Sequence, residues 1–320
     1  MIFYVYFDPQ IISTAQSSGN LGVQTLTGIL RALSQNCFLA EFNNYSYTQE
    51  EIGEQLKNIV GDFDTLALKK VLAHFAKERM FIECLDYDYS GITETEMAQN
   101  QAAEKLLDLL LLSDKAVVNS GVEVETATLE NYQSTYFEFE RSHTAVNGIS
   151  LAAASLDENE FLESYLKKAL QYASTIEIYD YLSGEKYKAN YAHTLKKFLG
   201  WLEIVNQEDL KITIHCGYPD GELDLFENRE FDGLNPAEIE TRKKEKLTQA
   251  LNALYGKSPI NVVCYDSKFA HDRFIITNQI AFSIGVGMDF LHYTGANKGK
   301  IRDISINLKD AKEVRSLVST

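Results

Sequence analysis

One segment, residues 269–291, holds most of the side chains in this chain that could act on a phosphate group. It reads FAHDRFIITNQIAFSIGVGMDFL and places His271 and Arg273 at the start of a short apolar run. A second apolar run follows and ends in a glycine-rich turn, residues 285–289. Arginine presents a planar fork to phosphate oxygens, and histidine could act as nucleophile, proton donor or hydrogen-bond partner. The pattern predicts a phosphate or phosphodiester site.

Strand geometry would bring these groups together. If residues 270–277 form a strand, His271 and Arg273 share one face and Asp272 lies on the other. The glycines of the turn would let backbone amides approach the same ligand. The alternative is a surface patch that only organises hydrogen bonds. The candidate phosphate-binding residues are His271, Arg273, Gly285, Gly287 and Asp289.

The spacing of this segment resembles the His-x-Lys-(x4)-Asp-(x6)-Gly-Ser signature of the phospholipase D superfamily. Here it reads His271-x-Arg273, four residues, Asn278, six residues and Gly285-Val286. The His-Asp-Arg start and the Gly-x-Gly-x-Asp ending are similar to the C-terminal phospholipase D-like domain of MIT-domain proteins that work with the ESCRT machinery. The resemblance covers about residues 158–310 and includes the segment TIEIYD at residues 175–180.

The resemblance implies catalytic roles for His271, Arg273 and Asn278. In active members the histidine attacks phosphorus, the lysine stabilises charge and the aspartate supports the histidine. Here arginine replaces the lysine, asparagine replaces the aspartate and Val286 replaces the serine. Asparagine cannot stabilise an imidazolium as a carboxylate can, and with Asp272 on the opposite face Asp289 is the only obvious replacement. Active members need two such motifs, so a two-histidine site would require a homodimer that pairs two copies of His271.

Charge separates the two halves of the chain, whose 320 residues are enough for two domains. Residues 1–150 contain 21 acidic and 9 basic side chains, and the remainder contains 25 and 21. An acidic surface repels nucleic acid and anionic lipid. We therefore expect a phosphodiester ligand, either nucleic acid or a phospholipid headgroup, to bind the second half. The acidic first half is expected to contact a protein partner.

The order of apolar segments predicts an α/β fold with two domains, residues 1–156 and 157–320. In the first domain, alternating strands and helices predict a mainly parallel sheet. Its expected strands are residues 2–7, 38–42, 80–85 and 116–119, and its expected helices are 23–33, 50–60, 65–79 and 94–112. Residues 121–156 are less periodic and are expected to bridge the halves.

The second domain is expected to be a phospholipase D-like α/β domain, as the resemblance implies. Asn235 is predicted to cap a helix that has Pro236 in its first turn. The expected strands are residues 175–181, 210–216, 260–265, 270–277, 279–284 and 301–308, and the expected helices are 158–173, 187–205 and 236–255.

Two acidic groups could bind a metal ion. Asp86, Asp88, Glu94 and Glu96 could form a nuclease-type site, although acidic loops after strands are common. Residues 220–232 contain six carboxylates but lack EF-hand spacing, as a solvated insertion would. The segment Gly19-Asn20-Leu21-Gly22 reads as a turn and cap rather than a nucleotide loop. We predict neither a resident metal nor a cofactor.

The cysteines favour a reducing compartment. Cys37, Cys84, Cys216 and Cys264 are far apart, and no Cys-x-x-Cys pair is present. They are predicted to be reduced core residues in a cytoplasmic protein. No apolar stretch reaches about 18 residues, and the N-terminus lacks the basic region of a signal peptide.

Three functions remain open from the sequence. The first is a phosphate-recognising protein with a degenerate phospholipase D-like domain, acting as an accessory component of a multi-protein system. The second is a metal-independent phospholipase D-family nuclease that uses His271 in a homodimer. The third is a purely structural partner in a bacterial defence complex.

Overall fold

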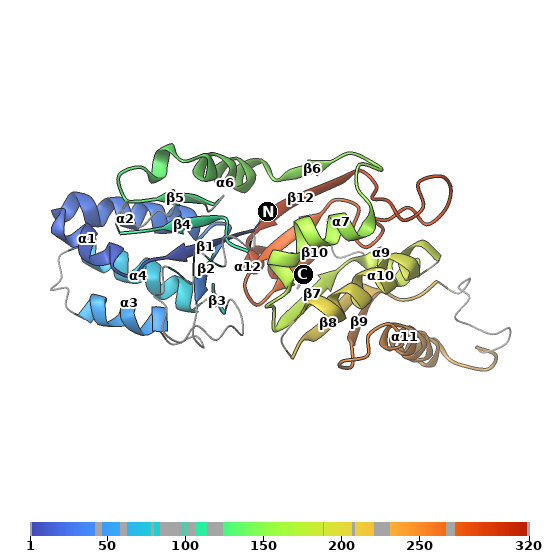
Figure 1. Ribbon diagram of the computed structural model, residues 1–320. Coiled ribbons are helices and arrows are strands. Elements are labelled where there is room, and N and C mark those ends of the chain that lie inside the picture. Colours follow the sequence, from blue (N-terminus) through green and yellow to red (C-terminus); the bar gives the residue numbers. More distant parts are fainter. Residues whose placement is uncertain are drawn as a thin grey trace. The chain divides into compact units, whose positions relative to one another are not determined.

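The chain forms two compact units, Met1–Val146 and Asn147–Thr320, each with its own β-sheet (Figure 1). The computed structural model describes residues 2–41, 47–57, 63–77, 80–83, 96, 98, 100, 106–113, 124–187, 189–206, 209–220, 231–266 and 273–318. A bilayer-spanning helix is not found among these residues, since each helix there is too short or too polar for one.

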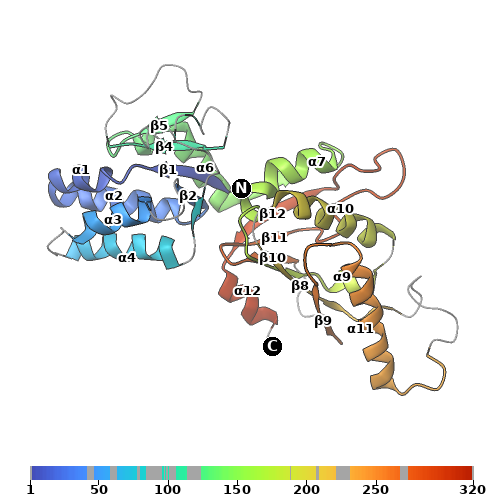
Figure 2. The same cartoon turned by 60° about the horizontal axis from the view of Figure 1, so that its bottom comes forward.

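The first unit contains a five-stranded, wholly parallel sheet in the order β3-β2-β1-β4-β5. Its strands are β1 (Phe3–Phe7), β2 (Cys37–Glu41), β3 (Phe81–Glu83), β4 (Leu109–Leu111) and β5 (Glu125–Ala127). Its helices are α1 (Ile11–Ser17), α2 (Gly19–Leu33), α3 (Tyr47–Lys57), α4 (Phe63–Lys77), the 3₁₀ turn η2 (Tyr132–Ser134) and α6 (Tyr136–Asn147). The helices α2 and α4 lie side by side in both views (Figures 1 and 2).

The predicted α/β class and parallel sheet are confirmed for this unit. Every residue of β1 and β2 is buried, as expected for strands covered on both faces. The helix expected over residues 94–112 is wrong at its C-terminal end, because residues 109–111 form β4 and pair with β1. This run is apolar throughout, so its pattern could not distinguish a helix from a buried strand. The strand expected at residues 116–119 lies outside the described residues.

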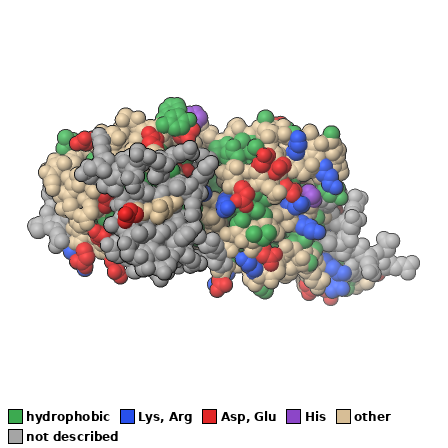
Figure 3. Space-filling view, viewed as in Figure 1, with side chains coloured by type: hydrophobic (Ala, Val, Ile, Leu, Met, Phe, Trp, Pro, Cys, Tyr) green, Lys and Arg blue, Asp and Glu red, His purple; other side chains and the backbone are tan. Residues whose placement is uncertain are grey.

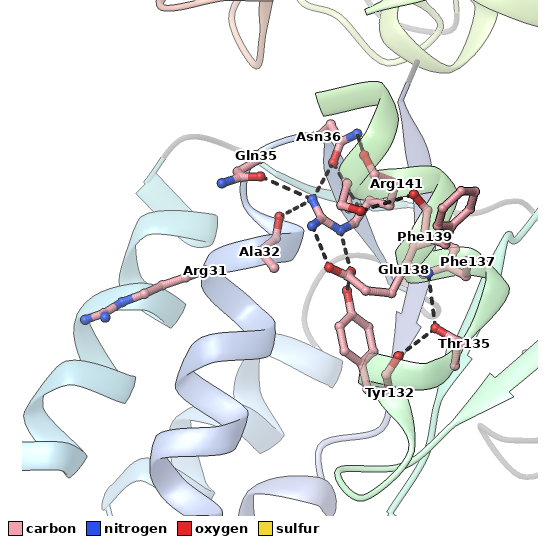
Figure 4. Close-up of polar contacts among 12 residues, drawn as sticks. Arg31, Ala32, Gln35, Asn36, Tyr132, Thr135, Phe137, Glu138, Phe139 and Arg141 are labelled. Carbon is pink, nitrogen blue, oxygen red and sulfur yellow. Dashed lines mark hydrogen bonds and ion pairs between the residues drawn. The ribbon is translucent and has the colours of Figure 1, made fainter. Parts of the chain in front are cut away.

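Arg141 joins α6 to the turn between α2 and β2 through a buried polar network (Figure 4). Its guanidinium forms two bonds with Glu138, Nε to Oε2 at 2.7 Å and Nη2 to Oε1 at 2.9 Å. Nη1 donates to the Ala32 carbonyl at 2.9 Å and to Asn36 Oδ1 at 3.1 Å. The Tyr132 hydroxyl donates to Glu138 as well. Because the buried charges are paired within the unit, the network is structural.

The second unit contains a mixed seven-stranded sheet in the order β6-β12-β11-β10-β7-β8-β9. Its strands are β6 (Ile149–Leu151), β7 (Thr175–Tyr179), β8 (Lys211–Gly217), β9 (Asn261–Tyr265), β10 (Phe274–Thr277), β11 (Ala281–Ile284) and β12 (Ile304–Lys309). Its helices are α7 (Glu158–Phe161), α8 (Lys167–Leu170), α9 (Tyr181–Glu185), α10 (Ala189–Val205), α11 (Pro236–Asn252) and α12 (Ala311–Val318), with the short π-helix η3 (Leu162–Leu166) between α7 and α8.

The neighbours β7, β8 and β9 are parallel, and the remaining pairs are antiparallel. On one face of the sheet, Val314 of α12 packs with Tyr179, Phe274 and Ile276. Asn235 caps α11 as predicted, accepting a hydrogen bond from the Glu238 amide in a capping box. The strand β6 and the helix α12 were not expected from the sequence.

Candidate functional site

The strand register of the second unit brings Arg273 and Asp180 together. Phe274 of β10 lies opposite Tyr179 of β7, so the preceding arginine and the following aspartate extend the same pairing. Asp180 therefore stands at the carboxyl end of β7, beside the carboxyl ends of β8 and β9. Ligands of α/β sheets usually bind at this edge.

Arg273 is held in place on two sides. Its Nε lies 3.8 Å from Asp180 Oδ1, and its Nη1 donates to the Gly285 carbonyl at 3.1 Å. The side chain is 27 % exposed. Among the described residues Nη2 has no hydrogen-bond partner. One edge of a fixed guanidinium is thus available to an anion.

Asp180 is a buried carboxylate, only 1 % exposed. Its Oδ1 accepts from the Leu182 amide at 3.1 Å, which caps α9, and its Oδ2 accepts from the Met288 amide at 2.8 Å. Burial raises the pKa of Asp180 to about 6, although these amides and Arg273 act in the opposite direction. The carboxylate is therefore charged at neutral pH and protonated in mild acid.

The glycine turn packs against this pair, and the amides of both glycines are already hydrogen-bonded within the unit. The Gly285 amide donates to the Ser305 carbonyl at 2.9 Å, and the Gly287 amide donates to the Ile284 carbonyl at 2.8 Å. Gly287 has φ +62°, and a Cβ there would lie 2.4 Å from Asp180 Oδ2 and 2.6 Å from Arg273 Cγ. Glycine is needed because both the backbone and the space exclude a side chain.

Little room is enclosed at this site. The space bounded by Asp180, Arg273, Gly287 and Met288 is too small for a water molecule. Only the exposed side of Arg273 therefore has room for an anion.

The structure separates Asn278 from this cluster. Its Oδ1 accepts from the amides of Ser174 at 2.8 Å and Thr175 at 3.3 Å, at the start of β7. Arg273 precedes β10 and Asn278 follows it, so the strand lies between them. At about 3.3 Å per residue, the two are roughly 16 Å apart. In this position the asparagine links the end of β10 to the start of β7.

The other expected site residues are distributed as follows. Asp289 forms an ion pair with Arg302 at 3.2 Å rather than with Arg273. His271 and Asp272 lie outside the described residues, so the expectation that His271 shares a strand face with Arg273, and that Asp272 lies on the other face, stays a prediction. Tyr191 of α10 is buried near the site. Its pKa is raised, mainly by burial and then by the negative charges of Asp180 and Asp289.

Among the described residues, no group of three His, Cys, Asp or Glu side chains could hold a metal ion. Asp86, Asp88, Glu94 and most of the acidic loop at residues 220–232 lie outside the described residues. Glu96 is exposed.

A second polar cluster lies on the sheet face that carries α12. His215 stacks on Tyr179 with ring centroids 4.1 Å apart, and its Nδ1 is 2.9 Å from the Tyr265 hydroxyl. Glu177 accepts from Arg315 at 2.7 Å and from the Tyr179 hydroxyl at 2.5 Å. Burial lowers the pKa of His215, partly offset by Glu177. These groups satisfy one another.

Two contributors to the Arg273 site, Asp180 and Tyr191, were not identified as site residues from the sequence. An aspartate directly after the apolar strand was the available signal for the first. Comparison with known proteins adds nothing to this geometry: no family model matches the chain, and no curated protein matches it.

Proposed function

We propose that the second unit is a degenerate phospholipase D-like domain that recognises a phosphate or phosphodiester group at the free edge of Arg273. One observation carries the proposal: a guanidinium is fixed by Asp180 and the Gly285 carbonyl at the carboxyl end of β7, with Nη2 unpartnered among the described residues. Because this side chain is already ordered, binding costs little conformational entropy. The amides of Gly285, Gly287 and Met288 already donate within the unit, so the arginine is the main anchor for a ligand.

Charge favours this unit over the first. On the face drawn in Figure 3, Lys and Arg side chains are spread over the second unit, whereas the described surface of the first shows mainly Asp and Glu. Asp180 offsets part of the charge of Arg273 at neutral pH. Such a site suits reversible recognition supported by further contacts along a polyanion.

Recognition without hydrolysis is the better proposal. Asn278 uses its carboxamide oxygen to hold the start of β7, so it supports no histidine at the Arg273 end. The carboxylate near Arg273 is Asp180, which accepts two backbone amides. The alternative is a nuclease that uses His271 in a homodimer, and a cleavage assay would detect it.

An accessory role with a protein partner is also part of the proposal. On α6 of the first unit, Tyr136 and Phe139 are each 65 % exposed and stack, and Phe139 stacks on His143. Figure 3 shows hydrophobic side chains and a histidine gathered over this helix. Exposed aromatic groups are enriched at protein interfaces. The free thiols of Cys37, Cys216 and Cys264 support a cytoplasmic location.

The test is binding of a fluorescein-labelled single-stranded oligonucleotide, followed by anisotropy at low salt, and of phosphatidylglycerol vesicles, followed by sedimentation. Arg273→Ala should weaken binding by roughly 5- to 150-fold, or about 1–3 kcal/mol, because a charge-assisted bond is lost. Arg242→Ala removes the same charge from exposed α11 and should leave affinity within about twofold. Equal affinities for wild type and Arg273→Ala would overturn the proposal.

A cleavage assay in EDTA uses the same oligonucleotide. We expect no product from wild type. Product that disappears in His271→Ala would establish the nuclease instead. If wild type binds neither probe, the phosphate proposal fails and the purely structural alternative gains support.

A further inference from the structure

Two cysteines form a pair across β8 and β9. Cys216 lies directly opposite Cys264 in the parallel register. Neighbouring strands are about 4.8 Å apart, a Cα separation that a disulfide can span. Register partners point to the same face of a sheet, so the two thiols are neighbours on one face. Both thiols are free.

The two thiols have different surroundings. Cys216 is fully buried beneath α9, where a Cβ at Gly184 would lie 2.6 Å from its Sγ. Cys264 is partly exposed, and the ammonium of Lys244 on α11 acts on it. The hydrogen bond from Cys216, then Lys244, lowers the pKa of Cys264 against the effect of burial. The hydrogen bond and burial raise the pKa of Cys216.

We propose that Cys216 and Cys264 are a redox-active dithiol, in which Cys264 reacts with a hydroperoxide and Cys216 resolves the product to an intramolecular disulfide. Partial exposure and a nearby cation are the setting of reactive thiols, whereas a buried thiol without them is inert. Two unreactive core cysteines would need neither the register pairing nor the exposure of one member. The pair is independent of the phosphate proposal, although both lie at the same strand-end edge.

The chemistry balances in two steps. The Cys264 thiolate attacks one peroxide oxygen, the O–O bond breaks, and the sulfenic acid forms as hydroxide or alkoxide leaves and takes a proton. The Cys216 sulfur then attacks the Cys264 sulfur, the S–O bond breaks, and water leaves with the Cys216 proton. Two thiols are oxidised and one hydroperoxide is reduced. A small dithiol reverses the change by thiol–disulfide exchange, itself becoming a disulfide.

The experiment uses the full chain treated with a few equivalents of hydrogen peroxide, blocked with N-ethylmaleimide and digested with trypsin. Cleavage after Lys and Arg places Cys216 in peptide 212–229 and Cys264 in peptide 258–268. Mass spectrometry should find these two peptides joined, with two hydrogens lost, and separated again by dithiothreitol. Both peptides recovered with maleimide on each cysteine after peroxide treatment would overturn the proposal, without any variant.

Variants then test which thiol reacts first. Cys216→Ser should stop at a Cys264 sulfenic acid that dimedone traps, and Cys264→Ser should give no sulfenic acid on Cys216. Lys244→Gln should slow oxidation several-fold, whereas Lys243→Gln, one residue away on the same helix, should not. Unchanged fluorescence of Trp201, which lies in the same unit as the substitutions, reports that each variant is folded. Oxidation of Cys216 in Cys264→Ser at the wild-type rate would overturn the assigned order.

Discussion

Replacing Asp180 by asparagine should change how the stability of the second unit depends on pH. Burial raises the pKa of Asp180 to about 6 from an ordinary value of 3.8. The folded state thus binds this proton more tightly than the unfolded chain. Its stabilising contribution is complete below pH 3.8 and is lost as the pH rises through about 6. The difference between the two pKa values makes the free energy of unfolding about 3 kcal/mol lower at neutral pH than in acid.

Asp180→Asn keeps the side-chain shape and removes the titration. Both carboxylate oxygens accept backbone amides, from Leu182 and Met288, so the new NH₂ group must face a donor. That mismatch costs about 1–3 kcal/mol at every pH. The ion pair with Arg273 forms only when Asp180 is charged, and its contribution is already included in the pKa of Asp180. The pH-dependent part of the difference between wild type and variant therefore comes from the titration of Asp180.

The assay is urea unfolding followed by fluorescence of Trp201, the single tryptophan of the chain, which lies in the second unit. Between pH 3.5 and 7.5, the unfolding free energy of wild type minus that of Asp180→Asn should fall by about 2–3 kcal/mol. Glu177→Gln is the control with the opposite sign. Burial opposes ionisation of Glu177, but hydrogen bonds from Arg315 and Tyr179 lower its pKa. Its difference should rise with pH. A constant difference for Asp180→Asn would refute the reasoning.

Three further substitutions test other features. Gly287→Ala should lower the free energy of urea unfolding, followed by Trp201 fluorescence, by about 1–3 kcal/mol more than Gly299→Ala does, because both glycines have positive φ but only the first lacks space. Equal losses would contradict the packing described. Asn278→Ala should cost about 1–3 kcal/mol in the same assay, whereas Asn278→Asp keeps both acceptor contacts and should cost less. A gain of phosphodiesterase activity in Asn278→Asp would contradict its placement away from Arg273. Arg141→Met should destabilise the first unit by about 3–5 kcal/mol in thermal melts followed by circular dichroism, because it leaves Glu138 buried without its cation. The exposed Arg31→Met serves as its control, and a similar small effect from both would argue against the network.

Local signals were enough for much of the fold. The segment 2–7 is apolar and buried on both faces, and Asn235-Pro236 marks a helix start through capping chemistry alone. Such elements can be predicted because the residues that determine them are neighbours in sequence. Residues 109–111 were misassigned because only their pairing with β1, about a hundred residues away, makes them a strand.

The candidate site shows the same division. Arg273 and the glycine turn were predicted from one continuous segment, but Asp180 comes from a strand 93 residues earlier and meets Arg273 only through the sheet register. The role of Asn278 could not be predicted either, because its partners Ser174 and Thr175 are about a hundred residues away and meet it only when β7 pairs with β10. The sequence could supply the residue types of the site and could not supply their partners.

The hydrogen bond from the Met288 amide to Asp180 joins positions 108 residues apart. A link of this span cannot form until β7 and β10 have paired, so the site is expected to assemble late in folding. The same span governs the native state, where this buried amide proton can reach solvent only when the strands separate. Its rate of hydrogen–deuterium exchange should therefore report opening of the sheet core as a whole rather than motion of the turn.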